Sequence, residues 1–192
     1  QRDVESGEQL IVGVNAFTGE GVEQRPSPQA IDPELEASQV ARTRAVRDAR
    51  DPERDRFILS KGHAALALYS ALYLRGWMTE QELNSYCGDA SLLGVHPEHA
   101  LRGVDFSVGS LGQGLSFGAG SALAARLRNS ARRVFVLVSD AECNEGALWE
   151  AAMFAAHQGL SNLTAIVDLN GQQAFGYTSE VLSLSPMAEK WR

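Results

Sequence analysis

Apolar residues follow two patterns along the second half of this chain, and each pattern predicts one kind of element. Residues 133–138 and 163–169 are short, nearly continuous apolar runs, which are typical of buried parallel strands. Residues 113–128 and 147–158 place small and apolar side chains at helical spacing. Strand, helix and strand in this order form a βαβ unit with a right-handed crossover. We therefore predict an α/β fold with a parallel sheet flanked by helices.

Two more helices are predicted upstream of this unit. Residues 60–74 have helical apolar spacing, which Gly76 interrupts. Thr79 is a suitable N-cap for a short helix that extends to Tyr86, because Glu82 stands at the capping-box position. A stretch rich in Gly, Ser, Asp and Pro then follows at 88–109 and is expected to be a loop.

The first 51 residues have a different character. They contain a short apolar strand at 10–14 and a Gly- and Pro-containing loop at 18–29. A charged helix follows, with Asp32 as its N-cap and Pro33 in its first turn. The apolar stripe of that helix is narrow and consists mostly of small side chains, so this piece cannot bury a core alone. We predict a strand–loop–helix appendage that needs a neighbour.

Composition narrows the class of protein. A chain of 192 residues with 44% hydrophobic residues can bury one α/β core and an appendage. The net charge of −7 argues against a nucleic-acid partner, because a phosphate backbone is bound by clustered Lys and Arg. Cys87 and Cys143 form no CxxC pair, so neither a disulfide framework nor a zinc site is supported. We see no membrane span and no signal peptide, and expect a cytoplasmic chain.

Polar residues at two strand ends form the candidate chemistry. Asp140 ends one predicted strand and Asn170 ends the next, and the carboxyl ends of parallel strands share one sheet edge, where open α/β folds bind ligands. Their oxygens, with a backbone carbonyl near Gln172, suit Mg²⁺, which commonly completes its shell with phosphates and water. The helix that begins near Gly146 directs amide N–H groups to the same edge. The pattern indicates a metal-bridged diphosphate, although an Asp in such a turn is also ordinary in α/β proteins.

The stretch VFVLVSDAECNEGALWEAAMFAAHQGLSNLTAIVDLNGQQAFG contains Asp140, Glu145-Gly146, Trp149-Glu150, Asn162-Leu163, Asp168-x-Asn170 and Gly176. It resembles the thiamine diphosphate signature, and more closely the transketolase version of it. The likeness extends upstream through DRFILSKGHAALALYSALYLRG and downstream to EKWR, and therefore covers about residues 55–192. It implies the N-terminal, diphosphate-binding part of a transketolase, here incomplete and truncated.

The resemblance assigns roles to individual residues. It implies that Asp140, Asn170 and the carbonyl of Gln172 bind Mg²⁺, or Ca²⁺ or Mn²⁺ in its place. It also implies that thiamine diphosphate is contacted by residues of a glycine-rich loop and of the two strand ends, namely Gly109, Ser110, Leu111, Ala141, Glu145 and Asn170.

Three catalytic residues are implied in the same way. His63 matches a histidine near the diphosphate, and His96 matches one that contacts the hydroxyls of the donor substrate. Glu145 matches an acid that orders the cofactor site and communicates across a dimer. Each also has a structural alternative: a backbone-bonded histidine for His63, a surface-loop histidine for His96, and a favourable helix N-terminal acid for Glu145.

The chain departs from the transketolase pattern in two places. The usual Gly-Asp-Gly reads Ser139-Asp140-Ala141. Alanine resists a positive φ, so we expect the turn to differ slightly, while its N–H stays available to a phosphate. The opening stretch of transketolases, which carries a further glycine–histidine motif, is missing.

Residues 1–51 resemble another family. VESGEQLIVGVNAFTGE and IDPELEASQVARTRAVRDARD are similar to a segment of the methylmalonyl-CoA mutase large subunit. No functional residue carries over from that family. We therefore divide the chain into a mutase-like appendage or joined fragment at 1–51 and a transketolase-type domain at 55–192. A natural fusion and a joining artefact both remain open.

The transketolase resemblance implies transfer of a two-carbon ketol unit between sugar phosphates. It also implies a partner, the C-terminal transketolase half with the pyrimidine-binding domain, in the same or another chain, within a homodimer or heterotetramer. We expect the isolated chain to be inactive. The alternatives are a fragment of a cobalamin-dependent acyl-CoA mutase and a non-catalytic subunit with a degraded cofactor site.

Overall fold

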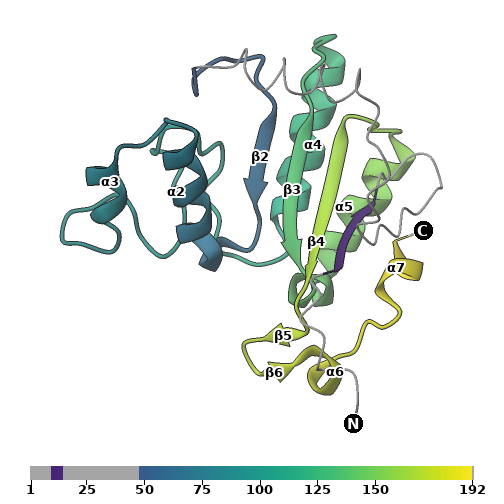
Figure 1. Cartoon of the computed structure of the whole chain (residues 1–192). Coiled ribbons are helices and arrows are strands. Elements are labelled where there is room, and N and C mark those ends of the chain that lie inside the picture. Colours follow the sequence, from purple (N-terminus) through teal and green to yellow (C-terminus); the bar gives the residue numbers. More distant parts are fainter. Residues whose placement is uncertain (1–9, 15–47, 192) are drawn as a thin grey trace, which may run out of the picture.

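The computed structural model describes residues 10–14 and 48–191. Its main sheet has the strand order β1-β4-β3-β2 (Figure 1). The strands are β1 (Leu10–Val14), β2 (Arg56–Leu59), β3 (Val134–Ser139) and β4 (Leu163–Leu169). The longer helices are α2 (Ala65–Leu74), α4 (Gly114–Leu127) and α5 (Gly146–His157), with the short α3 at Glu80–Asn84. The remaining short elements are η1 (Gly62–Ala64), η2 (Ala141–Asn144), β5 (Gln172–Gln173), β6 (Gly176–Tyr177), α6 (Thr178–Val181) and α7 (Met187–Lys190).

Strands β2, β3 and β4 form the predicted parallel sheet. Val134 of β3 lies opposite Arg56 of β2 and Leu163 of β4, so the three strands begin level with one another. The two strands predicted from apolar runs are therefore confirmed. β2 was not predicted, because its four residues are too few for a periodic pattern and include Arg56.

The predicted strand at 10–14 is also confirmed, and its neighbour in the sheet is β4. β1 pairs antiparallel with β4, with Leu10 opposite Leu169 and Val14 opposite Ala165. The loop predicted at 18–29 and the helix predicted from Asp32 lie outside the described residues. The division into units at 1–51 and 55–192 stays a prediction.

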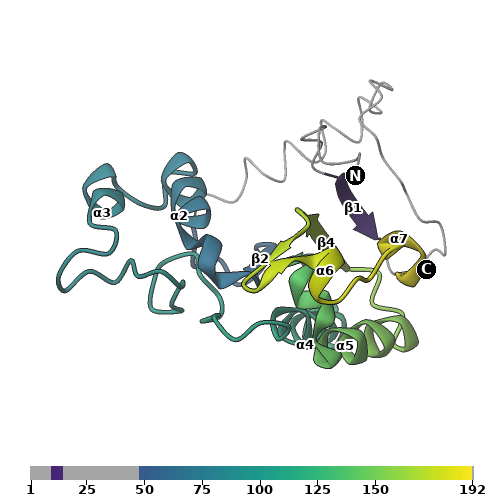
Figure 2. The same ribbon diagram turned by 90° about the horizontal axis from the view of Figure 1, so that it is seen from below.

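Helices α4 and α5 lie on the same face of the sheet (Figure 2). Alternate residues of β3 point to this face, and Val134, Val136 and Val138 are fully buried there. Gly118 lets α4 approach the sheet closely, since a Cβ at this position would lie less than 3.0 Å from a methyl group of Val136. The helices predicted at 113–128 and 147–158 are thus confirmed with ends shifted by one residue.

A second, smaller core lies under α2 and α3. Tyr69 is fully buried there, and its hydroxyl donates to the carbonyls of Gly94 and His96 at 3.0 and 3.1 Å. Burial raises the pKa of Tyr69 to about 12, which moves ionisation of this hydroxyl still further from neutral pH. This bond fixes part of the predicted loop 88–109.

The helix predicted at 60–74 needs a correction. Ser60 and Lys61 are not helical; the turn η1 follows them, and the regular helix begins only at Ala65. The capping box of Thr79 and Glu82 is confirmed, although α3 ends at Asn84 and does not reach Tyr86. None of the helices in the described part of the chain is long and apolar enough to cross a bilayer.

Residues 49–55, at the boundary of the two predicted units, pack against the α/β domain. The guanidinium of Arg54 forms two hydrogen bonds to the carboxylate of Asp105, at 2.7 and 3.0 Å, and its Nε donates to the carbonyl of Ala49 at 2.7 Å. Arg54 is buried, and a bidentate pair of this kind is stronger than an exposed ion pair. The segment before β2 is therefore anchored to the loop that precedes α4.

Two glycines of α4, each replaced by alanine, should show opposite effects on stability, because only one of them packs closely against the sheet. Gly118→Ala places a methyl group against Val136 and should lower the free energy of unfolding by about 1–3 kcal/mol. Gly120 has open space around its Cα, so Gly120→Ala should leave stability unchanged or raise it by up to about 1 kcal/mol. Urea unfolding of both variants checks this, and equal effects would contradict the close approach of α4 to the sheet.

The two cysteines should differ sharply in reactivity. Burial raises the pKa of Cys143 to about 12, whereas Cys87 is exposed. Because the thiolate is the reacting species, a chromogenic disulfide reagent at pH 8 should modify Cys87 in the native chain and spare Cys143. Cys87→Ser should remove the native reaction, and guanidinium should restore a reactive thiol in that variant. Rapid modification of native Cys87→Ser would contradict the burial of Cys143.

Candidate cofactor site

The turns that follow β3 and β4 are joined by Asp140. Its Oδ1 accepts a hydrogen bond from the N–H of Ala141 at 2.9 Å, and its Oδ2 accepts one from the N–H of Gly171 at 2.8 Å. The backbone supports this link, because the N–H of Asp140 donates to the carbonyl of Asp168 at 3.1 Å. The structure thus brings Asp140 beside Asn170 and Gln172, as the shared edge of parallel strands predicts.

The oxygen atoms at this edge fit a hard cation. Oδ1 of Asn170 accepts from the N–H of Gln172 at 2.9 Å, which folds the turn 170–172 back on itself. Each carboxylate oxygen of Asp140 accepts one hydrogen bond and retains a second acceptor position. The described residues contain no cluster of three His, Cys, Asp or Glu side chains that could hold a metal, so a cation here would take ligands of mixed kind. One carboxylate, one amide oxygen and one carbonyl with phosphate and water suit Mg²⁺.

Asp140 is buried, with 2% of the residue exposed. Burial raises the pKa of Asp140, the two backbone N–H bonds oppose this shift, and the nearby carboxylate of Asp168 adds to it. A cation bound at this edge would favour the ionised form of Asp140.

Ala141 tolerates its place in the turn. It lies in η2, and the non-glycine residues with positive φ in the described part of the chain are Cys87, Ala90 and Asn129. The turn thus forms without a positive φ at Ala141, which agrees with the expectation that alanine resists such a conformation. Its N–H is not free, however, because it donates to Asp140, so a phosphate would have to replace that bond.

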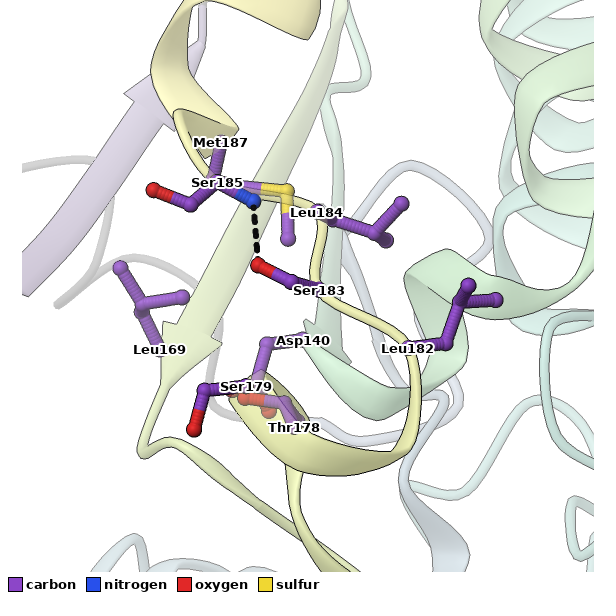
Figure 3. A pocket seen from close by; sticks show the side chains of 9 residues that line it. All are labelled: Asp140, Leu169, Thr178, Ser179, Leu182, Ser183, Leu184, Ser185 and Met187. Carbon is purple, nitrogen blue, oxygen red and sulfur yellow. Dashed lines mark hydrogen bonds between the residues drawn. The ribbon is translucent and has the colours of Figure 1, made fainter.

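A cavity of about 160 Å³ lies beside Asp140, under the segment 178–187 (Figure 3). Its wall combines Asp140 with the apolar side chains of Leu169 and Met187. The serine hydroxyls of residues 179, 183 and 185 add polar groups, and Oγ of Ser183 accepts from the N–H of Ser185 at 3.3 Å. The chain beyond β6 therefore packs back over the end of the sheet.

The glycine-rich loop before α4 contacts the start of α5. Gly112 has a φ of +78°, and a Cβ at this position would lie less than 3.0 Å from the Cβ of Glu145. Glu145 is the N-cap residue of α5, and its exposed side chain makes no capping hydrogen bond. Gly109, Ser110 and Leu111 form the exposed part of the same loop.

The two predicted catalytic histidines are both exposed, and His96 lies against this loop. A Cβ on Gly109 would lie 3.5 Å from the imidazole of His96, and a Cβ on Gly62 would lie 3.0 Å from it. Both glycines therefore pack closely on the ring. His63 follows Gly62 in η1. The structure therefore brings the loop, His96 and η1 together, while the catalytic and binding roles of the named residues stay predictions.

Sequence reasoning missed two buried polar groups at the same edge. Glu142 is fully buried in η2. Lys61, after β2, forms an ion pair with the carboxylate of Asp168 on β4, and Lys61 is also buried. The only available signal was polar character directly after a strand, which does not distinguish a buried anchor from an exposed turn residue.

Comparison with known proteins places these observations in a family. Residues 37–190 match the family model described as transketolase, thiamine diphosphate binding domain. The chain is 42% identical over 142 residues to the 6-deoxy-6-sulfo-D-fructose transketolase subunit SqwG of Clostridium sp. (strain MSTE9), covering 73% of this chain and 52% of that protein. It is 39% identical over 142 residues to an apulose-4-phosphate transketolase subunit of Phocaeicola vulgatus, covering 74% and 50%. The chain spans about half the length of these curated relatives.

Solved structures agree with the family assignment. The transketolase of Campylobacter jejuni superposes with a TM-score of 0.70 at 28% identity, over 75% of this chain and 24% of that one. The transketolase of Leishmania mexicana superposes with a TM-score of 0.68 at 30% identity, over 80% and 25%. With its parallel sheet, its flanking helices and its family match over residues 37–190, this chain belongs to the transketolase family and contains its thiamine diphosphate binding domain.

Proposed function

We propose that this chain binds the diphosphate of thiamine diphosphate through Mg²⁺ held by Asp140, Asn170 and the carbonyl of Gln172. The observation that supports the proposal best is the pair of hydrogen bonds that Asp140 accepts from Ala141 and Gly171, because they hold its carboxylate beside the turn that contains Asn170 and Gln172. Mg²⁺ prefers oxygen ligands and commonly keeps phosphate in its shell, and family membership names the phosphate compound.

The reaction we propose is the transketolase-type transfer of a two-carbon ketol unit between sugar phosphates. Thiamine diphosphate, when bound, supplies the carbon nucleophile for this chemistry. The chain's own residues would bind and orient the cofactor. The loop with Gly109, Ser110 and Leu111 would contact the aminopyrimidine, and His63 would contact the diphosphate. His96 would contact the hydroxyls of the sugar donor. Its exposed ring, packed on Gly62 and Gly109, is accessible to such a ligand.

A partner is part of the proposal. Two relatives are named as transketolase subunits, and this chain spans about half their length. We propose that a pyrimidine-binding half, in the same polypeptide or another chain, completes the site within a homodimer or heterotetramer. The exposed carboxylate of Glu145, beside Gly112, is suited to a contact across that interface.

Cofactor binding should be visible in the fluorescence of Trp149. Its indole N–H donates to the carbonyl of Cys143 at 2.8 Å, three residues beyond Asp140, so the ring reports on this turn. Thiamine diphosphate should quench the emission only with Mg²⁺ present, and Asp140→Ala should weaken apparent affinity about tenfold or more. Asp89→Ala, at an exposed loop position, is the matched control. Equal quenching of wild type and Asp140→Ala, or quenching in excess chelator, would refute the metal assignment.

Turnover should require the second half of the site. The 192-residue chain, saturated with Mg²⁺ and thiamine diphosphate, should show no steady-state ketol transfer above the protein-free rate. Addition of the pyrimidine-binding half of a subunit-type relative, or extension of the polypeptide to include it, should give turnover. Sustained turnover by the chain alone would contradict the proposed partner.

A further inference from the structure

Glu142 is the buried acidic side chain of the described residues that no role in the proposed function uses. It lies in η2, two residues after Asp140, and it is fully buried. Within the part of the chain that the structure describes, no ion pair joins it to a basic side chain. Since an isolated buried carboxylate is costly, its stabilisation has to come from hydrogen bonds.

Both oxygens of Glu142 are fully engaged as acceptors. Oε1 accepts from Oγ of Ser60 at 2.5 Å and from the N–H of Gly112 at 2.9 Å. Oε2 accepts from the N–H of Ser139 at 2.8 Å and from its Oγ at 3.3 Å. One carboxylate thus joins the residue after β2, the glycine-rich loop and the end of β3.

The loop is held at a second point through Ser60. Oγ of Ser60 donates to Glu142 and accepts from the N–H of Gly114 at 3.1 Å. A Cβ at Gly114 would collide with Ser60, and a Cβ at Gly112 would collide with Glu145, so neither glycine has room to shift toward its neighbour. Glu142 therefore fixes the loop at Gly112 directly and at Gly114 through Ser60.

We propose that Glu142 is a positioning residue that sets the glycine-rich loop 109–114 at the correct place relative to the Asp140 turn, and thereby controls affinity for thiamine diphosphate. The inference rests on the proposed function, because the loop matters for affinity only if the cofactor lies against it. Glu142 itself is buried beneath the loop and acts through Gly112 and Ser60.

The geometry predicts that glutamine does not replace Glu142. A glutamine amide has one acceptor oxygen and one NH₂ donor. The backbone N–H of Gly112 donates to Oε1, and that of Ser139 donates to Oε2. A backbone N–H cannot become an acceptor, so both positions of the side chain have to be acceptors. Either orientation of the amide would set NH₂ against a backbone N–H. Because Ser139 is held in β3 by its pairing with β4, the loop at Gly112 is the segment that Glu142→Gln should free.

The first experiment measures amide hydrogen exchange in the cofactor-free 192-residue chain. Exchange at Gly112 and Gly114 should be about tenfold faster in Glu142→Gln than in wild type, because a protecting bond is lost. Glu80→Gln, at an exposed position of α3, controls for the change of charge. Val134→Ala, at the opposite end of β3, controls for general loss of stability. Unchanged exchange at both glycines in Glu142→Gln would overturn the anchor.

The second experiment measures the affinity of the same variants for thiamine diphosphate at saturating Mg²⁺, by calorimetry. Glu142→Gln should bind about tenfold more weakly, while Val134→Ala and Glu80→Gln stay within about threefold of wild type. Affinity of Glu142→Gln within about twofold of wild type, or an equal loss in Val134→Ala, would overturn the positioning role.

Two further outcomes are decisive. If Glu142→Gln does not fold, Ser60→Ala removes one donor to Oε1 and the acceptor for Gly114; it should give the same two changes at about threefold or more, and wild-type behaviour would overturn the proposal. If the wild-type chain binds no thiamine diphosphate, the proposed function and the predicted effect of Glu142 on affinity are both refuted. Hydrogen exchange then decides by itself whether Glu142 anchors the loop.

Discussion

The pair of hydrogen bonds accepted by Asp140 is the contact on which the candidate site depends. β3 and β4 are parallel and in register up to Ser139 and Asp168, so their last residues end level at one edge. The carboxylate of Asp140 then accepts the N–H of Ala141 in its own turn and that of Gly171 in the next one. The backbone ladder and the bond from the Asp140 N–H to the Asp168 carbonyl hold the strand ends together, and the carboxylate adds a direct link between the two turns. Burial of the carboxylate raises its pKa, and the two N–H groups offset part of that cost.

Two further acidic groups fix the end of β2 to the same edge. Ser60 follows β2 directly and donates to Glu142, and Lys61 pairs with Asp168 across β3. These contacts join the ends of all three parallel strands through side chains, in addition to the backbone ladder. A binding site built on such rigid elements keeps its geometry better than one built on free loops. The glycine-rich loop gains its position from the same network, through the N–H of Gly112.

The outer residues of the site are exposed, whereas the residues at its centre are buried. Asp140 and Glu142 are buried, whereas His63, His96 and Glu145 are exposed around them. Leu111 of the glycine-rich loop is 39% exposed, and Phe175 between β5 and β6 is 87% exposed. The exposed residues around the buried centre leave room for the second transketolase half that we propose.

The sequence by itself determined the elements and the edge on which the chemistry lies. Apolar runs and helical spacing predicted β3, α5 and β4, and the turn residues Asp140 and Asn170 followed from their position after two such strands. These features are local, so their physical cause is contained in the sequence. β2 was not predicted, because a strand of four residues is too short to show a periodic pattern. Only the tertiary structure decided that Glu142 is buried and accepts from Ser60, Gly112 and Ser139, since those donors come from segments up to 82 positions away in the chain. A hydrogen bond between distant segments depends on how the chain folds back, and no local pattern records it.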